Sequence, residues 1–223
     1  MPWLPAMFVA VALAAVASAQ ELVSFATEDG GIVYADLYGK GGRGVVLAHG
    51  GQFNKGSWEK QALVLESTGF RVLAIDFRGY GQSHGGTRLR AGDDGTRFDV
   101  LAAVRYLRRR GAKTVSVVGA SFGGSAAAEA SIASKPGEID RIVLLAASIG
   151  ASEKLKGRKL FIVARDDVSG DGPRLPRIRA SFEKTPEPKE LIVVDGSAHA
   201  QFLFDTDQGE RVMREILRFL SAR

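Results

Sequence analysis

The stretch VSVVGASFGGSAAAEA, residues Val115 to Ala130, decides the fold. A β-branched apolar run passes into a segment rich in alanine, which predicts a buried strand followed at once by a helix. Ser121 stands at the junction, between Gly119 and Gly123. Because glycine has no side chain to clash where strand and helix approach, the turn can be sharp and can project the serine hydroxyl from the sheet.

Similar apolar runs alternate with helical segments along the chain. Nearly continuous apolarity indicates strands that are buried on both faces, which is typical of a parallel sheet covered by helices. We expect a hairpin at 22–39, strands at 44–51, 71–79, 113–121, 140–148, 159–167 and 190–198, and helices at 57–68, 96–110, 122–134, 176–182 and 209–222. The sequence therefore predicts a doubly wound α/β fold whose mostly parallel sheet has an antiparallel start.

Composition limits the partners and the chemistry. The chain has 223 residues, 45% hydrophobic and 25% charged, which suits one compact domain. Its net charge is +5, but Lys and Arg are scattered among Asp and Glu, and the basic groups at 105–110 and 154–159 carry no known nucleic-acid-binding motif. We therefore expect no nucleic-acid partner. The absence of Cys excludes disulfides, zinc–thiolate sites and a cysteine nucleophile.

The first residues have the layout of a secretory signal peptide. An apolar run from about Met7 to Val16 is followed by the small residues of 17–19. No Lys or Arg precedes the run, and a membrane anchor is the alternative, but the run is short for a bilayer span. We expect a signal peptide at 1–19, a mature domain at 20–223, export to the periplasm or beyond, and no membrane attachment after cleavage.

Several motifs, read together, resemble the α/β-hydrolase family from about Leu22 onward. They are HGG at 49–51, DFRGYGQS at 76–83, GASFGG at 119–124, ARDD at 164–167 and GSAH at 196–199. The resemblance implies an α/β-hydrolase fold and a catalytic serine, acid and histidine in that order along the chain. Many relatives insert a helical lid after the sixth strand, but the link from 148 to 159 has room only for a short helix. We therefore expect no cap domain and an open site.

A serine nucleophile needs a base within hydrogen-bond reach, and imidazole is the usual one. The chain has three histidines. His199 follows the last expected strand, at the carboxyl edge where Ser121 also emerges, and is the candidate base. His49 is better interpreted as a structural hydrogen-bonding residue, and His84 as an exposed residue of a Gly-rich loop.

The histidine in turn needs a carboxylate that fixes its tautomer. Asp166 and Asp167 are both available at the end of the seventh strand. In the family the acid usually stands three residues after the small residue that closes this strand. Taking Ala164 as that residue selects Asp167 over its neighbour, which should then face solvent or pair with a basic residue such as Arg165.

The resemblance also implies an oxyanion hole built from backbone N–H groups. One is that of Phe122, next to the nucleophile, and the other is that of Gly51, with Gln52 as the alternative. Three polar residues after the fourth strand are interpreted as scaffolding, a charged tie across the turn: Asp76, Arg78 and Ser83.

These inferences predict a secreted serine hydrolase that cleaves small carboxylic esters through an acyl-enzyme, without metal or cofactor. The pocket walls should come from loops such as 81–95 and 168–177. The absence of Cys argues against a close match to dienelactone hydrolases, which carry a cysteine nucleophile. An acyltransferase or a peptidase with the same triad, or a non-catalytic binding protein on this fold, remains an alternative.

Overall fold

The central sheet is mostly parallel, as the sequence predicts. The computed structural model describes residues 20–87 and 95–222, so the expected signal peptide at 1–19 lies outside the described residues. Across the sheet the strands are β1 (Glu21–Ala26), β2 (Gly31–Tyr38), β4 (Phe70–Ile75), β3 (Arg43–Ala48), β6 (Thr114–Ala120), β7 (Arg141–Leu145), β8 (Arg158–Ala164) and β11 (Lys189–Val194), with β5 (His84–Gly85) paired to β2. From β4 to β11 every pairing is parallel, whereas β2 pairs antiparallel with β1, β4 and β5. The predicted antiparallel start is confirmed.

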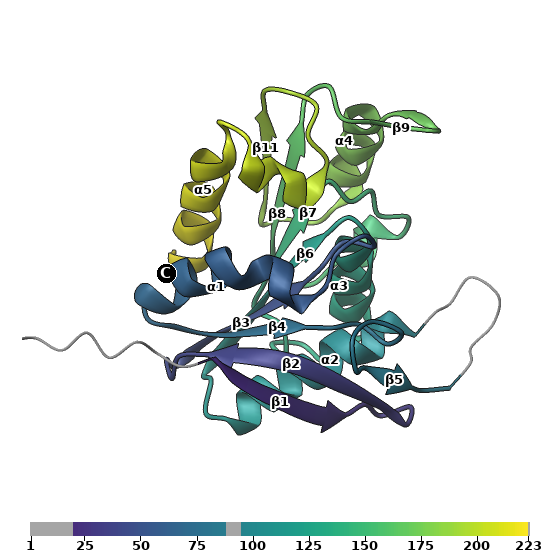
Figure 1. Ribbon diagram of the computed structural model, residues 1–223. Coiled ribbons are helices and arrows are strands. Elements are labelled where there is room, and N and C mark those ends of the chain that lie inside the picture. Colours follow the sequence, from purple (N-terminus) through teal and green to yellow (C-terminus); the bar gives the residue numbers. More distant parts are fainter. Residues whose placement is uncertain (1–19, 88–94, 223) are drawn as a thin grey trace, which may run out of the picture.

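Helices cover both faces of this sheet (Figure 1). They are α1 (Glu59–Ser67), α2 (Thr96–Arg109), α3 (Phe122–Ala133), α4 (Arg174–Lys184) and α5 (Gly209–Ser221). Two hydrophobic cores result, because successive strand residues point to opposite faces. Val46 belongs to the core that includes residues of α2 and α3, whereas Val45 belongs to the core that includes residues of α1 and α5. Burial on both faces is the physical reason for the continuous apolar runs in the sequence.

The chain passes from β7 to β8 without a lid. Residues 146–157 contain only the short 3-10 turn η2 (Ser152–Lys154), as the sequence predicts. Small elements that the sequence did not predict are β5, η1 (Lys55–Trp58), β9 (Val168–Ser169), β10 (Gly172–Pro173) and η3 (Ala200–Asp205). Helix α4 begins at Arg174, two residues earlier than predicted. Pro176 therefore stands inside its first turn, where a missing N–H costs no helical hydrogen bond.

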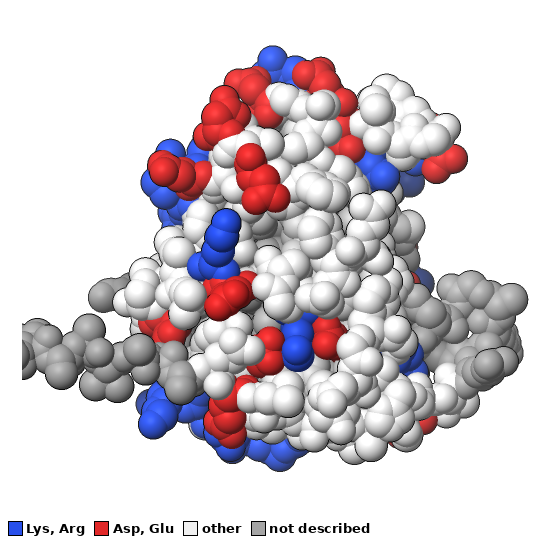
Figure 2. Space-filling model, viewed as in Figure 1, with Lys and Arg blue, Asp and Glu red and all other residues white. Residues whose placement is uncertain are grey.

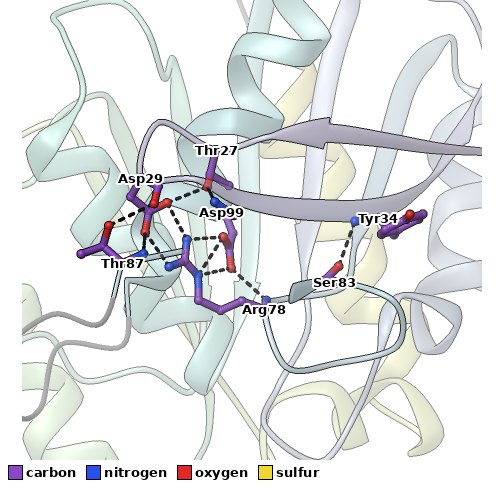
Figure 3. A network of polar contacts seen from close by, with 8 residues as sticks. Thr27, Asp29, Tyr34, Arg78, Ser83, Thr87 and Asp99 are labelled. Atoms are coloured by element: carbon purple, nitrogen blue, oxygen red, sulfur yellow. Dashed lines mark hydrogen bonds and ion pairs between the residues drawn. The ribbon is translucent and has the colours of Figure 1, made fainter. Parts of the chain in front are cut away.

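Arg78 ties the loop after β4 to two other segments (Figure 3). Its guanidinium donates to Asp29 Oδ2 at 2.6 Å and to the fully buried Asp99 Oδ1 at 2.7 Å. The hydrogen bond from Arg78 lowers the pKa of Asp29 to about 2. Nearby, Ser83 Oγ accepts the backbone N–H of Tyr34 at 2.8 Å. The scaffolding interpretation agrees with these contacts, but the charged tie runs to Asp29 and Asp99 in other segments and not across the turn itself.

Asp76 connects the same loop to the segment after β3. Its Oδ1 accepts the backbone N–H of Lys55 at 2.7 Å, and the Lys55 ammonium lies 3.5 Å from Asp36 Oδ2. Its interpretation as scaffolding agrees with these contacts.

Charged side chains are mixed over the face shown in Figure 2, where Lys and Arg do not gather into one basic surface. Arg105 and Arg108, from the basic group at 105–110, pair with Glu138 and Asp140. Within residues 20–87 and 95–222, no helix is long and apolar enough to cross a membrane. In the same ranges no group of three or more His, Asp or Glu side chains could hold a metal ion.

Candidate active site

Ser121 stands at a strained turn between β6 and α3. Its backbone has φ 51° and ψ −111°, a conformation that costs a residue with a side chain of order 1–3 kcal/mol. The glycines around it allow this turn. A Cβ on Gly119 would lie 2.3 Å from the carbonyl oxygen of Gly123, and one on Gly123 would lie 2.3 Å from that of Ala48. The expectation of a sharp turn is confirmed, and the serine is only half-buried.

Ser121 begins a continuous path of hydrogen bonds that joins the ends of β6, β11 and β8. Its Oγ lies 2.8 Å from Nε2 of His199, and Nδ1 of His199 lies 2.7 Å from Oδ2 of Asp167. A carboxylate can only accept, so Nδ1 carries the proton and Nε2 is left to accept the serine hydroxyl. The Asp167 side chain is 1% exposed and that of His199 is 27% exposed. The carboxylate is therefore closed off from solvent, whereas the imidazole is partly open to it.

The two neighbouring aspartates after β8 point in different directions. Asp166 is exposed, and its backbone N–H donates to the carbonyl of Gly196 at 3.0 Å. The carbonyl of Asp167 accepts the N–H of Arg174 at 2.9 Å, and Arg174 Nε lies 3.3 Å from Asp167 Oδ1. The start of α4 therefore holds Asp167 inward, against His199.

The other two histidines lie where the sequence indicated. His49 is fully buried, and burial lowers the pKa of its imidazole. The N–H of Phe77 donates to its Nε2 at 3.3 Å, so Nδ1 carries the proton and donates to the carbonyl of Gly50 at 2.8 Å. His84 is exposed in β5, with Nδ1 2.7 Å from the carbonyl oxygen of Gln82.

The loop after β3 is fixed at two consecutive carbonyl groups. The carbonyl of Gly50 accepts from His49 and from the N–H of Phe53 at 3.0 Å, and that of Gly51 accepts the Tyr80 hydroxyl at 2.8 Å. In a trans peptide the next N–H points opposite to the carbonyl, so the N–H groups of Gly51 and Gln52 have set directions. A Cβ on Gly51 would lie 3.8 Å from Phe122 Cβ, which places this loop beside the first turn of α3.

Gln201 was not identified from the sequence. Its Oε1 accepts the N–H of Gly50 at 2.7 Å, and its Nε2 donates to Ser57 Oγ at 2.8 Å. The side chain is buried and stands two residues after His199, across Ala200, whose φ is 52°. It joins the histidine loop to the loop after β3, a contact between distant segments that no local pattern reveals.

The serine opens into a cavity of about 390 Å³. Its lining comes from the loop after β3, the start of α3, the segment after β8 and the histidine loop: Gly50, Gly51, Gln52, Phe53, Ser121, Phe122, Val168, Arg174, His199, Ala200 and Phe202. The expected wall at 168–177 is therefore present. The expected wall at 81–95 is not found in its described part, because neither 81–87 nor Gly95 lines the cavity, and 88–94 lie outside the described residues. Residues 81–85 turn back instead to pair β5 with β2.

Comparison with known proteins shows the family to which the chain belongs. A model of the alpha/beta hydrolase family matches residues 45–220. The chain belongs to this family. A non-heme chloroperoxidase from Streptomyces lividans is 35% identical over 124 residues, which cover 54% of this chain and 43% of that protein. The chain spans less than half the length of the curated relatives it matches.

Two solved structures share the fold of this α/β hydrolase over nearly its whole length. An esterase from Pyrococcus furiosus has a TM-score of 0.73 at 20% identity, covering 90% of this chain and 93% of that one. A dienelactone hydrolase from Anabaena variabilis has a TM-score of 0.71 at 19% identity, covering 90% and 96%. At such low identity the likeness concerns the fold alone.

Proposed function

We propose that this α/β hydrolase is a serine hydrolase that cleaves carboxylic esters through an acyl-enzyme. The observation that carries the proposal is the path from Ser121 Oγ through His199 to Asp167, with contacts of 2.8 and 2.7 Å. A serine hydroxyl becomes a competent nucleophile when such a base takes its proton, and the carboxylate stabilises the imidazolium that forms.

In the first half of the reaction, Ser121 Oγ attacks the ester carbonyl and its proton passes to Nε2 of His199. The negative oxygen of the tetrahedral intermediate is held by the N–H of Phe122 and that of Gly51, with Gln52 as the alternative. When the intermediate collapses, the bond to the alcohol breaks, and His199 returns the proton to the leaving oxygen. Each donor in such a hole typically lowers the barrier by about 3 kcal/mol.

In the second half, water attacks the acyl-enzyme and His199 takes a proton from it. The carboxylic acid leaves, and Ser121 regains its hydrogen. An acyltransferase would use the same residues with another alcohol in place of water, so product analysis distinguishes the two reactions.

The cavity supports substrates of modest size. Its volume of about 390 Å³ lies at the lower end of the range for small-molecule sites, and its apolar part comes mainly from Phe53, Phe122, Val168 and Phe202. Because residues 146–157 form no lid, the ester can also belong to a larger molecule that stays outside.

The decisive experiment is labelling with a fluorophosphonate probe, combined with hydrolysis of p-nitrophenyl esters of increasing acyl length. We expect the wild type to be labelled and active, and Ser121→Ala and His199→Ala to lose several orders of magnitude in rate while remaining folded. His84→Ala is the matched control, because this exposed histidine lies outside the cavity. Unchanged labelling of Ser121→Ala would refute the proposed nucleophile.

We also propose that the protein is exported, on the strength of the apolar run and small residues within 1–19. The mature chain should then begin at Gln20 or Glu21. Exported protein that still begins at Met1 by N-terminal sequencing would contradict this.

A further inference from the structure

Arg174 lies at the wall of the cavity that contains Ser121. It is the first residue of α4, and its side chain is 27% exposed. Among the described residues that line the cavity it is the only Arg, Lys, Asp or Glu, and the same lining includes Val168, Phe53 and Phe202. Charge is costly to remove from water, so a cation in a mainly apolar cavity needs a partner, and Arg174 has one in Asp167.

The hydrogen-bonding capacity of Arg174 is largely unused. Its Nε is shielded from solvent and lies 3.3 Å from Asp167 Oδ1 in an ion pair without the geometry of a hydrogen bond. Within residues 20–87 and 95–222, neither terminal nitrogen donates to a protein group. Arg177, one turn further along α4, differs: its Nη2 donates to Ser169 Oγ at 2.7 Å, and its Nη1 lies 3.5 Å from Asp171.

A ligand in the cavity meets the cation of this pair rather than the anion. The Asp167 side chain is 1% exposed, with one oxygen on His199 and the other facing Arg174. The guanidinium is the accessible partner, and it presents planar N–H groups that match the two oxygens of a carboxylate. The net charge of +5 also favours the approach of anions.

We infer that Arg174 binds a free carboxylate on the substrate, so that the preferred substrates are esters that carry a second, ionised carboxyl group. The inference rests on the proposed ester hydrolysis and narrows its substrate class. The carboxylate can belong to the acyl part, as in the half-ester of a dicarboxylic acid, or to the alcohol part, as in the ester of a hydroxy acid.

The competing explanation is that Arg174 only neutralises Asp167. In that case its loss would disturb the orientation or basicity of His199 and would slow every ester alike. A substrate-binding arginine would change the ratio between charged and neutral esters, so this ratio distinguishes the two roles.

Two matched pairs of substrates test the inference. For the acyl part, the p-nitrophenyl half-ester of glutaric acid is compared with p-nitrophenyl valerate. For the alcohol part, 4-carboxyphenyl acetate is compared with 4-carbamoylphenyl acetate. We expect wild-type kcat/KM to favour the charged ester in one pair, and Arg174→Gln to lower that charged-to-neutral ratio roughly tenfold, mainly through KM. Arg174→Lys should fall between, and Arg177→Gln should leave the ratio unchanged.

A ratio that Arg174→Gln does not alter in either pair would overturn the inference, as would equal losses on charged and neutral esters. Hydrolysis of none of these esters by the wild type would instead count against the proposed function. Calorimetry with Ser121→Ala and monomethyl glutarate then tests the carboxylate site without turnover. Binding that is lost in Ser121→Ala/Arg174→Gln supports the site, and binding that is absent or persists in both proteins refutes it.

Discussion

Replacing Asp167 with Asn changes only an oxygen to an NH₂ group, yet the environment of this side chain makes the change severe. If the amide NH₂ faces His199 Nδ1, that nitrogen must accept, the ring proton moves to Nε2, and Nε2 can no longer accept from Ser121. If the amide turns over, its NH₂ faces the Arg174 guanidinium, now 3.3 Å from Oδ1. The cation therefore favours the orientation that gives the wrong imidazole tautomer.

We expect Asp167→Asn to lose up to about 10⁴ in kcat, which corresponds to about 5 kcal/mol of barrier. Asp166→Asn is the matched control, because this exposed carboxylate lies in the same turn and its side chain makes no hydrogen bond or ion pair within the described residues. Its rate should stay within about threefold of the wild type. The assay is hydrolysis of p-nitrophenyl acetate at neutral pH, with circular dichroism and a thermal melt to show that both variants fold.

A near-normal Asp167→Asn beside a crippled Asp166→Asn would refute this assignment of the acid. A second variant tests the part of the argument that involves the cation. In an Arg174→Leu background the amide is free to turn over, so the additional loss caused by Asp167→Asn should be smaller than in the wild type. Equal losses in the two backgrounds would show that Arg174 does not orient this side chain.

Two further substitutions test the support around the site. Gln201→Ala leaves the N–H of Gly50 without its acceptor and loosens the loop that carries the candidate oxyanion donor Gly51, so kcat should fall roughly tenfold with little change in KM. Gln201→Glu keeps an acceptor oxygen and should retain more activity. A change in KM alone would contradict this role. Arg78→Met leaves Asp99, whose side chain is 0% exposed, without a counter-charge and should cost about 3–5 kcal/mol of stability, seen as a fall in melting temperature of roughly 10 °C. The pKa of Asp29 is lowered from 3.8 to about 2, so its ionised carboxylate stabilises the folded state fully above about pH 4, and this contribution is lost as the pH falls towards 2. Between pH 4 and pH 2 the wild type should therefore lose about 2 kcal/mol more stability than Arg78→Met.

The parts of this fold that were predictable are those with local causes. Continuous apolar runs mark the strands because both faces of the sheet are buried, and the glycines at 119 and 123 mark the elbow because no side chain fits there. His199 could be placed at the carboxyl edge because it directly follows a predicted parallel strand. The choice of Asp167 over Asp166 came from the spacing that the resemblance implies, counted from Ala164, which is the residue that ends β8.

The parts that were not predictable depend on contacts between distant segments. Gln201 meets Gly50 across 151 positions of sequence, and a lone glutamine two residues after a histidine has no distinctive pattern. Arg174 was placed in a pocket wall only as part of a loop, because its role depends on where α4 begins. The small strands β9 and β10, which fix that beginning, are too short to leave a periodic signal in the sequence.

Backbone strain in this hydrolase is concentrated at the edge of the sheet where the site lies. Within residues 20–87 and 95–222, the non-glycine residues with positive φ are Ser121, Ala146 and Ala200, and each follows a strand of the parallel region or the loop after it. Such strain persists only where the surroundings hold it, and here the sheet core lies directly beneath. On either side of Ala200, His199 reaches Ser121 and Gln201 reaches the loop after β3. One strained turn thus connects His199, the candidate base, with the loop that carries Gly51, one of the two candidate oxyanion donors.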